Sequence, residues 1–161
     1  MISTRERYKV TPTQEAADIE TGTALLLHHK TRHNPLILPL DKPNDVFAQY
    51  FIGQGYLAPL GNDQLSAANV TFEPGCRNNW YIHYKGGKVL VCIAGHGWYQ
   101  KEGESAQTLK PEAVVSIHSE VKHWRGAAED SWFWHIALAV PAPGVSNERL
   151  EPVADEEYDE L

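Results

Sequence analysis

The chain has 161 residues, of which 42% are hydrophobic and 22% charged, and these proportions are ordinary for a single soluble globular domain. Its formal net charge of −7 is concentrated at the C-terminus, because residues 148–161 contain seven acids and one arginine. The remainder is nearly neutral and lacks the basic stripe that phosphate neutralisation requires, so we expect no nucleic-acid partner.

Residues 1–43 predict an N-terminal arm. The run Thr11-Pro12-Thr13-Gln14 can cap and start a short helix that ends near Gly22. Pro35 and Pro39 then interrupt an apolar stretch, and proline is excluded from the centre of a sheet. We therefore expect extended segments here rather than strands of the core.

The sequence lacks the features that would predict a membrane span, export from the cell or a disulfide scaffold. No stretch approaches the roughly 18 apolar residues of a membrane span, and no apolar signal-peptide run lies near Met1. Cys76 and Cys92 are too few for a disulfide scaffold. We expect a cytoplasmic protein with no membrane partner.

From residue 44 onward the pattern changes to short β-type runs separated by Gly- and Pro-containing turns. Their spacing of roughly 8 to 12 residues is typical of sandwiches and barrels, so the predicted fold class is all-β. The predicted strands are 46–52, 65–72, 79–84, 88–94, 97–101, 113–118, 121–125 and 132–140. We place a β-barrel over 44–145 and an acidic C-terminal tail over 146–161, in which Asp155 could cap one helical turn.

Two spaced motifs lie within these runs. Gly75-(five residues)-Tyr81-x-His83-(four)-Lys88-(six)-Gly95 overlays the first cupin motif at every spacing, and Glu112-(five)-His118-x-Glu120-x2-His123 overlays the second. With runs such as "VKHWRGAAEDSWFWHIAL", residues 46–158 resemble the small single-domain bacterial cupins related to carboxymuconolactone-decarboxylase-associated proteins and to cupin-type hydroxynitrile lyases. The resemblance implies a cupin barrel, that is, a double-stranded β-helix or jelly roll.

The same resemblance implies where a site would lie. In that family three histidines and a Gln or Glu hold a Mn, Fe or similar divalent ion inside the barrel. The four matching positions in this chain are Tyr81, His83, Lys88 and His123, so only His83 and His123 keep the family's ligand type. A further histidine, used for proton transfer in the lyase-like members, corresponds to His135, and another corresponds to Arg125.

The residue types at these positions disfavour a metal. Residues at i and i+2 of a strand share a face, so Tyr81 and His83 point together, and Lys88 enters the same face across a Gly-Gly hairpin. A protonated lysine about 4 Å from a divalent ion repels it by several kcal/mol even at an effective dielectric near 20. Tyr81 ligates only as a phenolate. We expect no cofactor, with Mn, Fe, Ni or Zn on His83 and His123 as the alternative.

Three interpretations remain open. Tyr81 and Lys88 fill a decayed barrel, or Lys88 replaces the charge of the metal and the barrel binds a small organic anion or carbonyl compound. In that case the ligand-binding residues are Tyr81, His83, Lys88, His123 and Arg125. In the third interpretation the chain is a metal-dependent lyase, dehydratase or isomerase. Its candidate catalytic residues are Lys88, His123 and His135, supported by His83, and whether there is catalysis at all stays open.

The oligomeric state is suggested by one strand. Trp132 and Trp134 alternate with Phe133 and His135, so both faces of this strand carry bulky groups. Either the N-terminal arm or a second subunit would have to cover the outer face. The family resemblance favours a homodimer.

Overall fold

The structure is a computed structural model that describes residues 42–161. The predicted short helix and all of the predicted arm except residues 42 and 43 lie outside this described part. In this described part, thirteen strands form two antiparallel sheets. The first contains β1 (Lys42–Pro43), β3 (Gly55–Pro59), β4 (Ala67–Phe72), β12 (Phe133–Val140), β7 (Gly87–Gly95) and β10 (Val114–His118), in that spatial order. The second contains β13 (Ser146–Arg149), β6 (Tyr81–Tyr84), β11 (His123–Ala127), β5 (Arg77–Asn78) and β2 (Phe51–Ile52), with β8 (Gly97–Lys101) and β9 (Gln107–Leu109) alongside β11.

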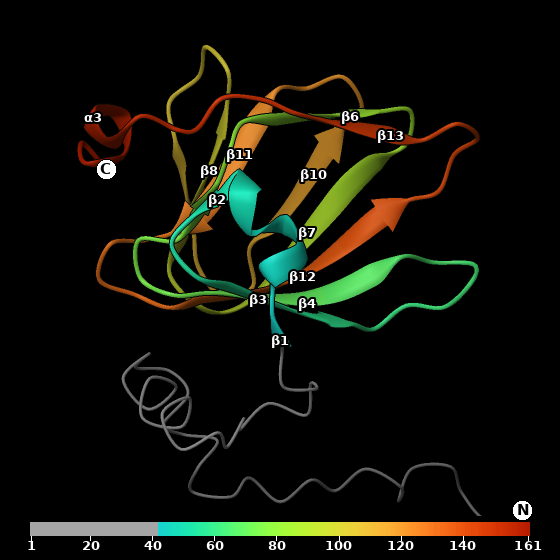
Figure 1. Ribbon diagram of the computed structural model, residues 1–161, viewed down its shortest axis with the longest axis horizontal. Coiled ribbons are helices and arrows are strands. Elements are labelled where there is room, and N and C mark those ends of the chain that lie inside the picture. The colour runs from blue at the N-terminus through green and yellow to red at the C-terminus, as the bar shows by residue number, and fades with distance from the viewer. Residues whose placement is uncertain (1–41) are drawn as a thin grey trace, which may run out of the picture.

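The two sheets face each other and enclose a core (Figure 1). Alternation along each strand decides which residues face inward. On β7, Leu90 and Cys92 are buried, and on β12 the inward set is Phe133, His135 and Ala137, as the period-two pattern predicts. This arrangement confirms the predicted all-β jelly-roll barrel. No helix within residues 42–161 is long and apolar enough to cross a membrane.

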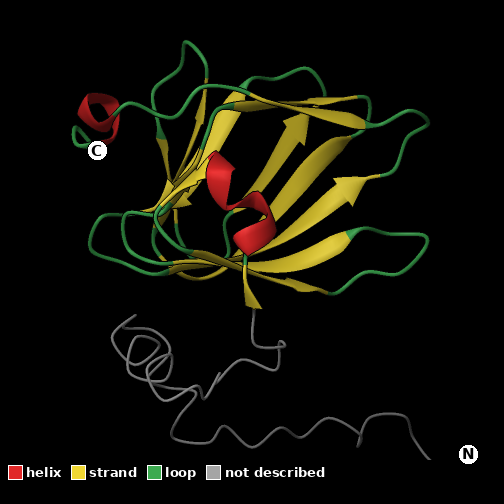
Figure 2. Cartoon of the chain, in the orientation of Figure 1, coloured by secondary structure: helices red, strands yellow, loops and turns green. Residues whose placement is uncertain are grey.

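Two short helices lie outside the sheets (Figure 2). The 3-10 helix η2 (Asp45–Tyr50) occupies most of the predicted strand 46–52, of which only Phe51–Ile52 pairs in a sheet. The strand prediction was wrong because the apolar side chains of this run are not buried together; Val46 is 80% exposed. Sequence patterning also missed β3, β9 and β13, which are short and rich in polar residues, glycine or proline.

The C-terminal segment is part of the domain rather than only a tail. Strand β13 pairs with β6, so the barrel extends past the predicted boundary at residue 145. The helix α3 (Asp155–Tyr158) forms the predicted turn, but Asp155 does not cap it and instead makes an ion pair with Arg77. Tyr158 is buried and its hydroxyl donates to the carbonyl of Ala127 at 2.6 Å. These contacts fix the acidic end against the second sheet.

The outer face of the first sheet carries an aromatic cluster. Trp132 and Trp134 stack with ring centroids 5.5 Å apart, and Tyr56 stacks on Trp132 at 6.2 Å. Both tryptophans are buried. The strand therefore has bulky groups on both faces, as predicted, and the homodimer stays a prediction.

The turns of the two cupin motifs keep a left-handed backbone even where glycine is missing. Gly75 and Gly95 have φ of 77° and 76°. Glu112 and Glu120, which stand where the second motif has glycine, have φ of 74° and 67°. This conformation costs an L residue roughly 1–2 kcal/mol relative to glycine. The backbone therefore retains the motif although its side chains have changed.

Glu120→Gly is expected to stabilise the protein by about 1 kcal/mol, because glycine removes the steric cost at φ of 67°. Urea unfolding at neutral pH measures the change. The matched control is Glu129→Gly, also an exposed glutamate in a turn but without positive φ, which should be neutral or destabilising. Equal effects of the two substitutions would contradict a strained backbone at Glu120.

Candidate functional site

The second sheet supplies most of the site through two paired strands. Tyr81 and His83 lie on β6, His123 and Arg125 lie on β11, and Tyr81 is the register partner of His123. All four side chains are buried. The Tyr81 ring packs on both imidazoles, with centroids 4.9 Å from His83 and 4.1 Å from His123. The predicted shared faces therefore bring these residues together.

The first sheet supplies the remaining two residues from the opposite side. Lys88 lies on β7, and its ammonium is 5.9 Å from the centroid of the Tyr81 ring. His135 lies on β12 beside a register irregularity and packs between Phe133 and Phe72, with ring centroids at 4.7 and 5.3 Å. The six predicted positions thus converge inside the barrel, from both sheets.

Arg125 connects the two sheets within the barrel. Its Nε donates to His135 Nε2 at 2.8 Å, and its Nη1 donates to the Tyr81 hydroxyl. Its own backbone N–H donates to the Asn78 side chain at 3.2 Å. Because His135 Nε2 accepts a hydrogen bond, the neutral ring carries its hydrogen on Nδ1. Arg125, at the position where the resemblance predicts a histidine, is thus a cation with two neutral side-chain partners.

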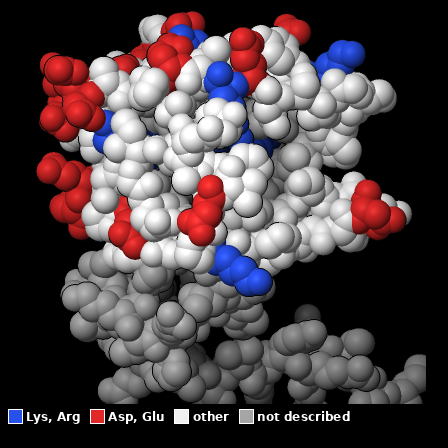
Figure 3. Space-filling model, viewed as in Figure 1, with Lys and Arg blue, Asp and Glu red and all other residues white. Residues whose placement is uncertain are grey.

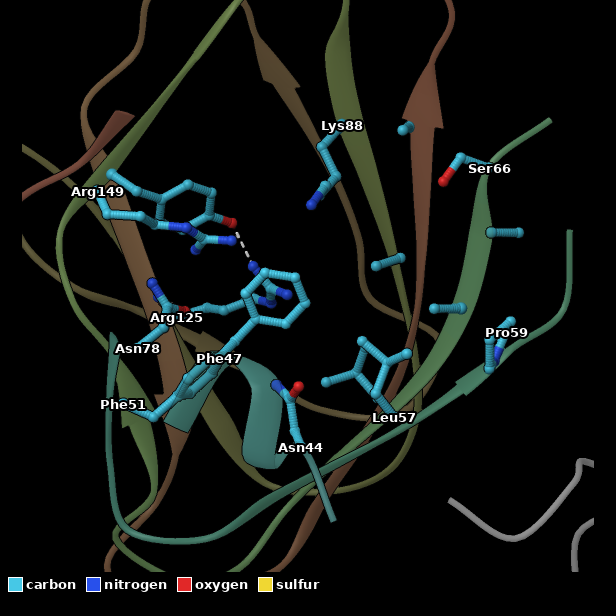
Figure 4. A pocket seen from close by; sticks show the side chains of 16 residues that line it. Asn44, Phe47, Phe51, Leu57, Pro59, Ser66, Asn78, Lys88, Arg125 and Arg149 are labelled. Atoms are coloured by element: carbon cyan, nitrogen blue, oxygen red, sulfur yellow. Dashed lines mark hydrogen bonds between the residues drawn. The ribbon is translucent and has the colours of Figure 1, made fainter. Parts of the chain in front are cut away.

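A pocket of about 340 Å³ opens on one side of this network. Its lining residues are Asn44, Phe47, Phe51, Leu57, Pro59, Ser66, Ala67, Ala68, Val70, Asn78, Tyr81, Lys88, Arg125, Ala137, Ala139 and Arg149. Lys88 extends into the pocket from β7, and Arg125 and Arg149 reach it from the other wall (Figure 4). His83, His123 and His135 do not line it and lie behind the Tyr81–Arg125 pair.

The pocket is cationic and uncompensated. Lys88, Arg125 and Arg149 line it, and none of its lining residues within the described part of the chain is acidic. Within residues 42–161, none of the three makes an ion pair. Burial, followed by the charges of Arg125 and Arg149, lowers the pKa of Lys88 to about 7. Burial is also the largest cause that lowers the pKa of Arg149.

Charge on the surface is arranged differently from charge in the pocket. On the face shown in Figure 3, some basic side chains lie in and beside a central hollow and others at the margins, and acidic side chains are spread around them. The net charge of the whole chain is −7. The pocket therefore gathers positive charge in a protein that is negative overall.

The buried histidines are held neutral by their surroundings. Burial, then Lys88, lowers the pKa of His83 to about 4, although a hydrogen bond from Nδ1 to the Asn147 side chain opposes this. Burial lowers the pKa of His123 to about 3, and its Nδ1 donates to the Val121 carbonyl at 2.8 Å. His135 is fully buried and its pKa is lowered well below the usual value, first by burial and then by Arg125.

Of the four positions that match the family's metal ligands, two carry an imidazole nitrogen that could bind a metal ion. The Nε2 atoms of His83 and His123 have no hydrogen-bond partner, and their ring centroids are 5.6 Å apart. The other two positions hold the Tyr81 hydroxyl, which accepts from Arg125, and the Lys88 amine. No group of three or more His, Cys, Asp or Glu side chains among residues 42–161 is arranged to hold a metal ion. This donor set does not fit the four-ligand centre of the family.

Sequence reasoning missed Arg149 and Asn147. Both were assigned to the acidic tail, but β13 places Asn147 opposite His83 and Arg149 opposite Tyr81. The guanidinium of Arg149 lies 5.0 Å from the centroid of the Tyr81 ring. The available signal was that Arg149 is the single basic residue in an otherwise acidic run. His118, in contrast, is exposed and does not line the pocket.

Stability is expected to fall as the pH is lowered from 6.5 to 5. The unfolded histidines titrate near 6.5, whereas folded His83 and His123 titrate near 4 and 3, so the unfolded state binds more protons in this window. The contribution of these two imidazoles to the free energy of unfolding is complete above pH 6.5 and is lost as the pH falls toward their folded pKa values. Each neutral imidazole adds a slope of up to about 1.4 kcal/mol per pH unit.

Urea unfolding of the protein with chelator at pH 7, 6 and 5 measures this slope. A free energy of unfolding that is constant over this window would contradict neutral burial of the histidines.

Comparisons with known proteins place this site in context. No protein-family model matches the chain. The (R)-mandelonitrile lyase of Granulicella tundricola is 36% identical over 115 residues, which cover 69% of this chain and 87% of that protein. A cupin-like protein from Thermotoga maritima superposes with a TM-score of 0.72 and 32% identity, over 78% of this chain and 96% of its own.

More distant structures share the fold alone. A DMSP lyase from Ruegeria pomeroyi superposes with a TM-score of 0.53 at 18% identity, over 92% of this chain and 83% of its own. Taken with the barrel, the motif spacing and the left-handed turns, these similarities assign the family. The chain belongs to the cupin superfamily, among the small single-domain cupins related to the hydroxynitrile lyases.

Proposed function

We propose that this cupin barrel binds a small organic anion or carbonyl compound in the pocket beside η2, without the divalent ion of its relatives. The observation that supports the proposal is the convergence of Lys88, Arg125 and Arg149 on one pocket that no acidic residue among 42–161 lines. Two unit charges about 8 Å apart repel by about 2 kcal/mol at an effective dielectric near 20. A bound anion offsets this repulsion, and arginine suits carboxylates because its fork matches their geometry.

The composition of the pocket argues against a decayed site. A barrel that only needed filling would gain most from apolar side chains, since an unpaired buried charge is costly. Instead, a space of about 340 Å³ remains beside three cations. This volume lies at the small end of ligand pockets. Leu57, Val70 and several alanines form the opposite, apolar wall, so a compound with one anionic end and a short apolar end suits the pocket.

The metal-free part of the proposal rests on the donor set. Lys88 and the Arg125-bound Tyr81 occupy two of the four ligand positions, and each of the nearby cations opposes a divalent ion. In this proposal the Lys88 ammonium takes over the electrostatic role that the ion has in relatives. His83 and His123 then support Tyr81 from behind rather than bind a ligand directly.

A second candidate function is that of a lyase, dehydratase or isomerase in which His123 and His135 transfer protons. It is favoured by the similarity to an (R)-mandelonitrile lyase. Proton transfer from either imidazole to a compound in the pocket would require the Tyr81–Arg125 pair to open, because both rings lie behind it. Turnover of cyanohydrins, lactones or 2-oxo acids that disappears in His135→Ala, with the fold retained, would favour this candidate over binding alone.

Lys88→Met is expected to weaken the binding of propanoate at least tenfold at pH 6, where the ammonium is protonated, because a charge-assisted hydrogen bond contributes about 1.5–3 kcal/mol. Wild-type affinity should also fall as the pH rises through about 7. Titration calorimetry at low salt measures both effects. Lys85→Met, in the exposed hairpin beside it, is the matched control and should bind normally. Equal affinity for neutral propanamide would contradict recognition of the charge.

The double substitution Tyr81→His with Lys88→Gln is expected to create affinity for Mn²⁺ or Ni²⁺ that the parent lacks, because it restores three imidazoles and one oxygen donor at the family positions. Metal content after dialysis and calorimetric titration measure it. Tyr81→Phe with Lys88→Met removes the same groups without adding ligands and should gain no affinity. A stoichiometric ion that resists dialysis in the parent would contradict the metal-free proposal.

A further inference from the structure

Among the described residues, Lys88 is the only primary amine that lines the pocket. It points into the cavity, and within residues 42–161 it has neither a hydrogen-bond partner nor an ion-pair partner (Figure 4). Burial and the two arginines lower its pKa to about 7, so a substantial fraction is the neutral amine near neutral pH. An amine in this state attacks carbonyl carbons, whereas the ordinary surface lysine does so poorly.

The two arginines face this amine from the other sheet. Lys88 belongs to β7, Arg125 to β11 and Arg149 to β13, and all three cationic groups lie within 6 Å of the Tyr81 ring centroid. The Arg149 guanidinium has no hydrogen-bond or ion-pair partner in the described part of the chain, and Arg125 has only neutral ones. One wall of the pocket therefore carries two guanidinium groups that can bind a carboxylate, and the other wall carries an amine that can act as a nucleophile.

A 2-oxo acid matches these two walls. Its carboxylate suits the guanidinium groups, and its carbonyl carbon is directly bonded to the carboxylate, so binding of one end delivers the other to the amine. The apolar wall of Leu57, Val70 and Ala137 then faces the short side chain of the acid. A simple carboxylate would bind to the cations of the pocket but would offer the neutral amine no ketone carbon to attack.

We propose that Lys88 condenses with the keto group of a small 2-oxo acid held by Arg125 and Arg149, and forms an imine inside the barrel. This inference rests on the proposed function, since it requires the same pocket to accept an organic anion. The Lys88 nitrogen adds to the carbonyl carbon to give a carbinolamine. The carbon–oxygen bond then breaks, the oxygen leaves as water, and a carbon–nitrogen double bond remains. No electrons are transferred to or from another reactant.

Tyr81 is suited to assist the loss of water. Its hydroxyl oxygen accepts from Arg125, so its own hydrogen remains available to an oxygen in the pocket that it lines. The positive charges of the two arginines favour the neutral amine needed for attack. The carboxylate of the bound acid compensates those charges when the imine becomes protonated.

Reductive trapping tests the inference on the full-length protein. Pyruvate is added with sodium cyanoborohydride at pH 7, and intact mass and peptide mapping locate the adduct. The expected result is one adduct, on Lys88, at pyruvate concentrations that leave exposed Lys85 and Lys110 unmodified. Lys88→Arg should give none, since a guanidinium does not condense in this way. The matched variant Lys85→Arg should retain the adduct in full.

Calorimetry with pyruvate and propanoate separates this inference from the proposed function. If both bind but no adduct forms on Lys88, covalent capture is wrong and anion binding stands. If neither binds and no adduct forms, both are wrong. Labelling of Lys88 no faster than that of Lys85 would also overturn the inference. The peptide map of the wild-type protein decides the question even if the Lys88 variant fails to fold.

Discussion

The interior of this barrel is organised by one guanidinium. Arg125 leaves β11 and donates to Tyr81 on the same sheet and to His135 on the other, so a single side chain ties both halves of the barrel together at their centre. In a low-dielectric interior a charged donor with neutral acceptors forms strong hydrogen bonds but leaves its charge uncompensated. The same residue therefore provides cohesion and makes the neighbouring pocket electropositive.

The remaining features of the site follow from that charge. Arg125 contributes to the lowered pKa of Lys88, and burial together with these cations keeps all three inner histidines neutral. Tyr81 is packed between the imidazoles and the pocket, and its hydroxyl is already engaged by Arg125. Lys88, Arg125 and Arg149 together make the pocket electropositive. A compensating carboxylate would thus complete the charge balance.

The comparison with relatives separates fold from chemistry. The barrel is retained closely enough that the second motif keeps two left-handed turns with glutamate in place of glycine. Its inner surface carries Tyr81, Lys88 and Arg125 at positions where the motif resemblance predicts histidines and an amide or acid. Sheet pairing is determined by many contacts along each strand, whereas a site depends on a few side chains. Members of one family can therefore share a barrel and differ in what it binds.

The sequence by itself determined the parts of the structure that obey a local rule. The period of two placed Tyr81 with His83, and His123 with Arg125, on shared inward faces, and motif spacing brought Lys88 into the same interior. What only the tertiary structure decided depends on pairing across long stretches of chain. Arg149 enters the pocket because β13 pairs with β6, more than sixty residues earlier. The exposed polar pattern of β13 does not predict this pairing, although Arg149 is the single basic residue in an acidic run. The same holds for three further features: the hydrogen bonds of Arg125, the 3-10 helix η2 in place of the expected strand, and the separation of the inner histidines from the pocket. Each arises from packing between the sheets, which no local pattern encodes.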